Sequence, residues 1–321
     1  MSPYLGRWCE HDPEEIVANT LTCMERALAA VPGGATASDV ACVGITNQRE
    51  TTVAWNATTG DPLHNAVVWL DMRTSQLCAD LETTFESKDH FRDTCGLPIS
   101  TYFSGMKMRW LLDNVPAVKE ASVSSNLRFG TIDSWLIHRL TRGGAHVTDV
   151  TNAARTMLMD LETLQWHAPT LDALGIPAGS LPRIVSCAET YGTIAEGPLA
   201  GVGLTGCLGD QHAATLGQRC NPGEAKNTYG TGCFMLLNTG AVPVASTHGL
   251  LTTLAWKLGP AAEAQYALEG SVAIAGAGVQ WLRDNLGIIK SAKDVEPLAA
   301  SVPDTGGVYF VPAFSGLFAP R

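Results

Sequence analysis

The sequence predicts an α/β protein built in two parts. Short apolar runs that suit buried strands alternate with segments of helical periodicity through most of its 321 residues. After residue 224 the pattern changes to successive strands separated by turns. We therefore expect one domain over residues 1–219 and the beginning of a second over residues 220–321, with the boundary near Arg219 to Asn221.

The first elements follow from capping residues and apolar runs. Asp12 can cap a helix, and Pro13 suits its first position. Val40 to Thr46 is typical of a buried strand, and the polar run Asn47 to Glu50 leaves its carboxyl end. Ligands collect at that end of the strands in open α/β sheets, so this run is a candidate binding segment.

The later elements are predicted from the same two periodicities. In the first domain we expect strands at Thr51 to Trp55, Ala66 to Leu70 and Leu204 to Leu208, and helices at Arg73 to Leu81, Lys107 to Leu112, Ser134 to Leu140 and Ala213 to Gln218. In the second we expect strands at Ala225 to Thr228, Cys233 to Asn238, Leu251 to Trp256, Gln265 to Leu268 and Val308 to Val311, with a helix over Ala273 to Leu286. Residues 160–201 are rich in Pro and Gly, which predicts loops and short helices.

Composition excludes several functional classes. A hydrophobic content of 45% with 16% charged residues is typical of a globular protein, and no run of ~18 apolar residues predicts a membrane span. The net charge of -10 argues against binding to nucleic acid or anionic membranes. Nine cysteines without a Cys-x-x-Cys pair indicate buried, reduced thiols and a cytoplasmic location, with mitochondrial association or organelle targeting left open. The eight histidines lack metal-ligand spacing, so no protein-bound metal is predicted.

The strand ending in Gly209-Asp210-Gln211 supplies a candidate catalytic acid-base group. Gly-Asp at such a point is usually an ordinary turn or helix cap. A functional interpretation is that Asp210 orients an alcohol and accepts its proton during attack on phosphorus, with Gln211 as a neutral partner. We take Asp210 as the candidate base.

Two glycine-rich segments are candidates for phosphate and nucleotide binding. Tyr229-Gly230-Thr231-Gly232 is more often a hairpin turn than a phosphate cradle, yet its amides and the Thr231 hydroxyl could contact a phosphate. The Walker lysine is absent. Gly276 lies in a run of small residues that allows close helix packing, and it could equally lie against a nucleotide with Gln280 as polar partner.

A polyol site would draw on residues from several elements. Arg49-Glu50 would by default be a surface ion pair, but a guanidinium and a carboxylate together satisfy vicinal hydroxyls, which both donate and accept. Tyr102 could add a hydroxyl, although a buried aromatic residue is the usual role. Trp69 and Phe234 are typical core residues that could also cover the carbon side of a polyol and exclude water.

Longer motifs show a family resemblance. The chain resembles the glycerol kinases of the sugar and polyol kinase family, on Glu10 to Pro13, Thr148-Asp149, Thr151 to Ala153, Gly209 to Gln211, Asn227 to Phe234, Ala267 to Gly270, Gln280 to Asp284 and Val311 to Phe314. The resemblance implies the two-domain actin-like ATPase (ribonuclease H-like) fold and ATP-dependent 3-phosphorylation of glycerol. It implies that glycerol is held by Arg49, Glu50, Trp69, Tyr102, Asp210, Gln211 and Phe234. It further implies that Thr231, Gly276 and Gln280 contact ATP or ADP, used with Mg²⁺.

The chain also departs from that family's pattern. The Asp-x-Gly-Thr-Thr-Ser hairpin that holds nucleotide phosphates and helps place Mg²⁺ is absent, and so is most of the second domain after Ala319-Pro320. We therefore expect a fold incomplete at both ends and little or no turnover by this chain alone. The alternatives are a silent glycerol-binding short form or subunit partner, and a related kinase for another small polyol or sugar. Homo-oligomer formation is left open.

Overall fold

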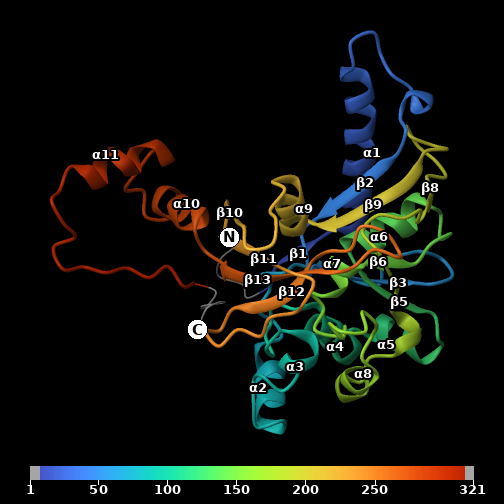
Figure 1. Cartoon of the computed structure of the whole chain (residues 1–321), viewed down its shortest axis with the longest axis horizontal. Helices are drawn as coiled ribbons and strands as arrows, with labels where there is room; N and C mark the ends of the chain where they lie inside the picture. The colour runs from blue at the N-terminus through green and yellow to red at the C-terminus, as the bar shows by residue number, and fades with distance from the viewer. Residues whose placement is uncertain (1–7, 315–321) are drawn as a thin grey trace.

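The computed structural model describes residues 8–314, which form the α/β arrangement drawn in Figure 1. Within this range the strands form sheets in the orders β1-β4-β3-β5, β10-β11-β13-β12, β2-β9-β8 and β6-β7. Helices pack against all four sheets, and the second sheet leads into two further helices that extend to one side of the molecule in Figure 1. The predicted α/β class is confirmed.

The first helix, α1 (Pro13–Ala30), begins as its capping residues predict. Asp12 accepts a hydrogen bond from the amide of Glu14 at 2.8 Å, and Pro13 occupies the first turn. The predicted first strand is β2 (Val43–Asn47), which pairs in parallel with β9 (Gly203–Gly209). The short β8 (Gly192–Thr193) runs antiparallel to β9 on its other side.

Among the other strands of the first domain, β3 (Thr52–Asn56) and β4 (Ala66–Val67) lie close to their predicted positions. The remaining strands were not predicted and are β1 (Glu10–His11), β5 (Leu127–Thr131), β6 (Val147–Asp149) and β7 (Arg183–Val185). The helices are α2 (Ser75–Thr84), α3 (Arg92–Cys95), α4 (Ser104–Asn114), α5 (Pro116–Val123), α6 (Ile132–Leu140), α7 (Val150–Ala153) and α8 (Ala168–Leu174), with short 3₁₀ turns η1 (Ala37–Asp39) and η2 (Ala178–Ser180). The helix after β9 is α9 (Asp210–Gly217), which begins at Asp210 rather than at Ala213.

The second sheet is antiparallel throughout. It comprises β10 (Ala225–Tyr229), β11 (Cys233–Gly240), β12 (Leu251–Trp256) and β13 (Gln265–Val272). It is followed by α10 (Gly276–Asp284), η3 (Ala292–Asp294) and α11 (Val295–Ala300). The helix predicted from Ala273 begins later, at Gly276, because β13 continues to Val272.

The strand predicted at Val308 to Val311 is wrong. These residues have no strand partner in the described part of the chain, and Tyr309 is 88% exposed. An apolar run forms a strand only where a neighbouring strand supplies its hydrogen-bond partners.

One hydrophobic core joins the two predicted domains. Its largest cluster takes most of its members from α2 to α5 and the strands around them, and it also contains Phe234, Leu236 and Leu251 from the second sheet. The second sheet is therefore packed directly against the first part of the chain. Of the nine free thiols, Cys23 and Cys42 are exposed, so the prediction of general thiol burial is wrong at these two positions. Among residues 8–314, no helix has the length and apolar character that crossing a bilayer requires.

Candidate active site

Parallel pairing of β2 with β9 brings two candidate segments together. The last residues of the two strands, Asn47 and Gly209, are direct partners in the register. Arg49 and Glu50 follow the first strand, and Asp210 follows the second as the first residue of α9. Segments about 160 residues apart in the sequence thus meet at one sheet edge, where ligands bind in α/β folds.

Glu50 adopts an unusual backbone conformation at this edge. Its φ of 58° lies in the left-handed region, which is uncommon for a residue with a side chain. Its carbonyl accepts hydrogen bonds from the hydroxyls of Ser104 and Thr52, both at 3.0 Å. The surrounding structure therefore holds a strained conformation, as occurs at ligand-binding sites.

The predicted acceptor residues line a single small cavity. Its volume is ≈ 50 Å³, and it is bordered by Gln48, Arg49, Glu50, Trp69, Tyr102, Asp210, Gln211 and Phe234. All seven residues proposed from the sequence are present, and Gln48 is the one addition. The ring of Trp69 lies 5.7 Å from that of Tyr102 and 5.9 Å from that of Phe234, which forms an aromatic wall.

Arg49 belongs to a buried network of alternating charges. It makes a bidentate pair with Glu269 of β13, at 2.6 Å and 2.9 Å. Arg155 bridges the two acids, lying 2.6 Å from Glu50 and 3.2 Å from Glu269. Burial alone would raise the pKa of Glu269, but Arg155 and Arg49 outweigh it and lower that pKa well below its ordinary range. The default interpretation of Arg49 and Glu50 as a surface ion pair is wrong, because both side chains are buried and pair mainly with other residues.

Asp210 differs from its neighbours because it remains accessible. Its side chain is 44% exposed, whereas those of Arg49 and Glu50 are each 2% exposed. One carboxylate oxygen accepts from the backbone amide of Gln211 at 2.8 Å, and the other accepts from its side-chain amide at 3.1 Å. Arg49 Nε lies 3.5 Å from the first oxygen. A carboxylate that is oriented yet open to solvent can receive a proton from an alcohol in the cavity.

Tyr102 closes the cavity as a neutral phenol. Burial raises its pKa above the ordinary value of 10.0. Its hydroxyl lies 3.4 Å from Nη2 of Arg49, which donates to it. The hydroxyl therefore stays protonated at neutral pH and is a hydrogen-bonding group at the cavity.

His212 lies directly behind the network and does not face the cavity. It is fully buried, and burial followed by the positive charge of Arg49 lowers its pKa well below the ordinary value. Neither ring nitrogen has a hydrogen-bond partner among the residues that the structure describes. A neutral, enclosed imidazole suits a structural role.

Sequence reasoning missed three charged residues of this region, Arg155, Lys226 and Glu269. Each is buried and has at least one partner far away in the sequence or on another element. Glu269 falls in the Ala267 to Gly270 motif, which was noted only as part of the family resemblance. For Arg155 no local pattern gives a signal, because its partners are 105 and 114 residues away.

The two glycine-rich segments lie against each other. Gly230, Thr231 and Gly232 form the turn between β10 and β11, so the hairpin interpretation of this segment is correct. The amide of Gly276 donates to Gly230 O at 2.9 Å, and that of Ala275 donates to Thr231 O at 2.8 Å. A Cβ atom on Gly276 would lie 2.6 Å from Gly230 O, so the close approach requires glycine.

Gln280 lies one turn further along α10. It is exposed, and its spacing from Gly276 places both residues on one face of the helix. The structure thus brings Thr231 together with Gly276, with Gln280 beside them. Nucleotide contact by these three residues stays a prediction.

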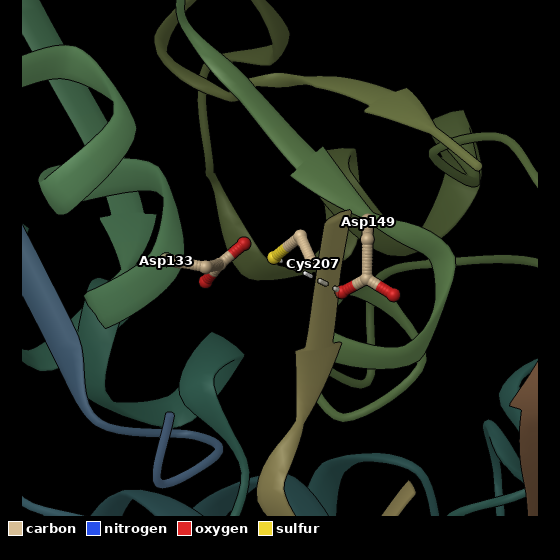
Figure 2. Close-up of side chains that lie close together, drawn as sticks. All are labelled: Asp133, Asp149 and Cys207. Carbon is tan, nitrogen blue, oxygen red and sulfur yellow. Dashed lines mark hydrogen bonds between the residues drawn. The ribbon is translucent and has the colours of Figure 1, made fainter. Parts of the chain in front are cut away.

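Asp133, Asp149 and Cys207 form a buried group with the residue types of a metal site (Figure 2). They come from α6, β6 and β9, so no short sequence spacing reveals them. Burial, and next the charge of Asp149, raises the pKa of Asp133 to about 6. Burial also raises the pKa of Cys207, which therefore remains a protonated thiol.

Hydrogen bonds from neighbouring residues account for the burial of these two carboxylates. Asp133 accepts from the hydroxyls of Thr131 and Thr148. Asp149 accepts from the amides and side chains of Thr151 and Asn152. A protonated thiol and saturated carboxylates do not suit Mg²⁺, which prefers oxygen ligands with several waters. The group is a polar core that joins three elements.

Comparison with known proteins defines the class to which this fold and site belong. Residues 2–217 match the N-terminal domain of the FGGY family of carbohydrate kinases, and residues 225–321 match its C-terminal domain. The chain therefore belongs to this family and has its two-domain actin-like ATPase fold, as predicted. The boundary predicted near Arg219 falls between the two matched ranges.

Among individual proteins, the chain is similar to glycerol kinases. It is 60% identical to the glycerol kinase of Arabidopsis thaliana over 98% of this chain and 61% of that protein. It is 56% identical to the Nocardia farcinica glycerol kinase over 98% of this chain and 62% of that protein. The chain thus spans about three fifths of the length of these relatives.

Solved structures give the same picture. The crystal structure of Plasmodium falciparum glycerol kinase with ADP matches with a TM-score of 0.86 and 40% identity, over 100% of this chain and 63% of that chain. A ligand-bound xylulose kinase from Lactobacillus acidophilus matches with a TM-score of 0.80 at 21% identity, over 98% of this chain and 62% of that chain. The second likeness extends only to the fold.

Proposed function

We propose that this chain carries the acceptor site of a glycerol kinase, which transfers the γ-phosphoryl group of ATP to the 3-hydroxyl of glycerol and releases sn-glycerol 3-phosphate. The observation that carries the proposal is the single cavity bordered by all seven predicted acceptor residues. The similarity to glycerol kinases of two organisms supports the same substrate.

The cavity suits a three-carbon acceptor. A volume of ≈ 50 Å³ has room for roughly four water-sized groups, which is the scale of a small triol rather than a five-carbon sugar. The aromatic wall of Trp69 and Phe234 would cover the carbon chain and exclude water, which competes with the alcohol as acceptor. This observation favours glycerol over another polyol or sugar.

Each polar residue then has a separate task. Arg49 donates to a glycerol hydroxyl and Glu50 accepts from one, so a pair of neighbouring hydroxyls is satisfied in both senses. Asp210 orients the reacting hydroxyl and takes its proton late in phosphoryl transfer, while positioning supplies most of the rate. Gln211 keeps both oxygens of that carboxylate in place through its two N–H groups.

ATP would approach from the hairpin between β10 and β11. Thr231 and Gly276 lie together there, and Gln280 follows on the exposed side of α10. Phe234 of β11 follows Thr231 of the turn by three residues, which is at most roughly 10 Å of extended chain. Mg²⁺ is usually bound through substrate phosphates, so we propose that the metal accompanies the nucleotide phosphates, and we assign no step to it.

Calorimetric titration with glycerol tests the acceptor site directly. We expect the wild-type chain to bind glycerol and Arg49→Ala and Asp210→Ala to weaken binding at least about tenfold, since each removes a charged hydrogen-bonding group. Arg142→Ala is a matched control, because Arg142 is 66% exposed and pairs only with Glu196 on the surface. Absence of glycerol binding by folded wild-type protein would refute the proposal.

An assay of ADP release with glycerol, dihydroxyacetone and a pentulose then separates the alternatives. Release with glycerol supports the kinase, and preference for the pentulose supports the sugar kinase. Glycerol binding without ADP release supports the alternative of a glycerol-binding protein that does not turn over. That alternative arises because the chain spans about three fifths of its relatives.

We also propose a cytoplasmic location. All nine cysteines are free thiols, which suits a reducing compartment. Localisation of a tagged protein would test this, and sedimentation of the purified protein would settle whether it forms homo-oligomers.

A further inference from the structure

Lys226 is a buried lysine beside the candidate active site that the proposed reaction does not yet use. It lies on β10 and is 2% exposed. Its ammonium donates to the side-chain oxygen of Gln211, to Thr228 Oγ1 at 3.0 Å and to Phe234 O at 3.1 Å. An ammonium has three donors, so these three acceptors satisfy it completely.

The first of these bonds fixes the orientation of the Gln211 amide. Because the oxygen of that amide receives the Lys226 bond, its nitrogen faces the other way and donates to Asp210 at 3.1 Å. A reversed amide would place its oxygen against the Asp210 carboxylate and its NH₂ group against the ammonium, and both contacts would be repulsive. Lys226 therefore determines which Gln211 atom meets the candidate base.

The third bond reaches a second residue that lines the cavity. Phe234 contributes its ring to the aromatic wall, and its carbonyl is held by the same ammonium. One cation thus ties a residue of α9 and a residue of β11 to β10. Gln211 and Phe234 both border the cavity, so Lys226 holds two of its lining residues together.

The ammonium is surrounded by charges from several elements. Burial lowers the pKa of Lys226 to about 8, and the positive charge of Arg49 adds to this effect, whereas Glu269, Asp210 and Cys220 act in the opposite sense. The ammonium therefore loses its charge, and one of its three donors, as the pH rises through about 8.

We propose that Lys226 is a positioning residue of the acceptor site: its ammonium locks the Gln211 amide so that Asp210 is aimed at the acceptor hydroxyl, and it holds Phe234 in its place in the aromatic wall. This inference rests on the function proposed above. It assigns no contact between Lys226 and the substrate.

The effect of Lys226 on the Gln211 side-chain amide can be measured without glycerol. In protein labelled with [¹⁵N]glutamine, the side-chain NH₂ signal of Gln211 is identified by its loss in Gln211→Glu. We expect that signal to shift and to exchange faster with water in Lys226→Met, and to do the same in wild-type protein as the pH is raised from 6.5 to 9.5. A signal unchanged by both the substitution and the pH would overturn the inference.

Glycerol titration then tests the consequence for the site. We expect wild-type protein to lose glycerol affinity above pH 8, as the ammonium loses its charge. We expect Lys226→Met to bind glycerol about tenfold more weakly at pH 7 and to lack this pH dependence. Lys226→Arg keeps the charge and should recover part of the affinity. Lys257→Met is the matched control, since the ammonium of Lys257 donates to the carbonyls of Gly259 and Pro260, away from the residues that border the cavity.

The outcomes separate the two proposals. Wild-type glycerol affinity and pH dependence in folded Lys226→Met would overturn the role of Lys226. Failure of wild-type protein to bind glycerol would refute the proposed function, while the NMR signal of Gln211 would still decide whether Lys226 locks the amide. If Lys226→Met does not fold, the wild-type pH titration decides alone.

Discussion

Asp133→Asn tests how strongly the buried polar group of Figure 2 affects stability. Asp133 is fully buried, and burial with the nearby charge of Asp149 raises its pKa from 3.8 to about 6. The folded protein therefore binds the Asp133 proton more tightly than the unfolded chain does. Its contribution to stability is present in full below pH 3.8 and is lost as the pH rises through about 6.

The size of this loss of stability follows from the difference between the pKa of Asp133 in the folded and in the unfolded protein. Moving a pKa from 3.8 to about 6 corresponds to about 3 kcal/mol of folding free energy. Asparagine has the shape of the acid and no charge, and the hydroxyls of Thr131 and Thr148 can turn to serve its amide. We expect Asp133→Asn to match wild type near pH 4 and to be more stable by about 2 to 3 kcal/mol at pH 7.5.

Denaturant unfolding at half-unit steps between pH 4 and pH 8 measures this difference, with tryptophan fluorescence as the signal. Asp172→Asn, an exposed substitution on α8, is the control and should leave the difference flat. A stability difference between Asp133→Asn and wild type that does not grow between pH 4 and pH 7 would refute the reasoning. Lower stability of the variant at every pH would show that the carboxylate is needed for its hydrogen bonds.

Three other substitutions probe the site. Asp210→Asn removes the proton acceptor and keeps its size, so any glycerol-dependent ADP release that the wild-type chain gives should fall at least about 10²-fold while calorimetry still detects glycerol binding; undiminished release excludes Asp210 as base. Glu269→Gln leaves two buried guanidiniums without their shared carboxylate and should lower the free energy of unfolding by about 3 to 5 kcal/mol, whereas an unchanged denaturation midpoint would contradict the network's importance. Gly276→Ala puts a Cβ atom 2.6 Å from Gly230 O and should weaken ATP binding about tenfold in a titration; equal ATP affinity would place the nucleotide elsewhere.

The sequence predicted the parts of the site that depend on strand ends. An apolar strand followed by Asn47 to Glu50 predicts a binding segment at the carboxyl end of a strand, and another such strand ends in Gly209-Asp210. The register of β2 with β9 brings these two strand ends together, which the sequence did not predict. The aromatic wall was predicted from residue type and family resemblance together. The binding roles of these residues stay predictions, although their positions around one cavity agree with them.

The partners of the buried charges could not be predicted. Arg49 is adjacent to Glu50 in the sequence but pairs with Glu269, which is 220 residues away. Local patterns identify charged residues, yet only tertiary structure decides which opposite charge is buried beside them. The false strand at Val308 to Val311 has a related cause, since strand formation depends on a partner that the segment's own sequence does not specify.

The link between Arg49 and Glu269 also has a consequence for the order of folding. During synthesis from the N-terminus, Arg49 and Arg155 leave the ribosome long before Glu269 does. Until β13 joins the sheet, these two guanidiniums lack the buried carboxylate that they share, and their remaining carboxylate partners are Glu50 and, for Arg49, the partly exposed Asp210. Their complete burial is then unfavourable. The acceptor cavity therefore reaches its final form only after β13 has docked. The contact between Arg49 and Glu269 has a high sequence separation, and such contacts form late.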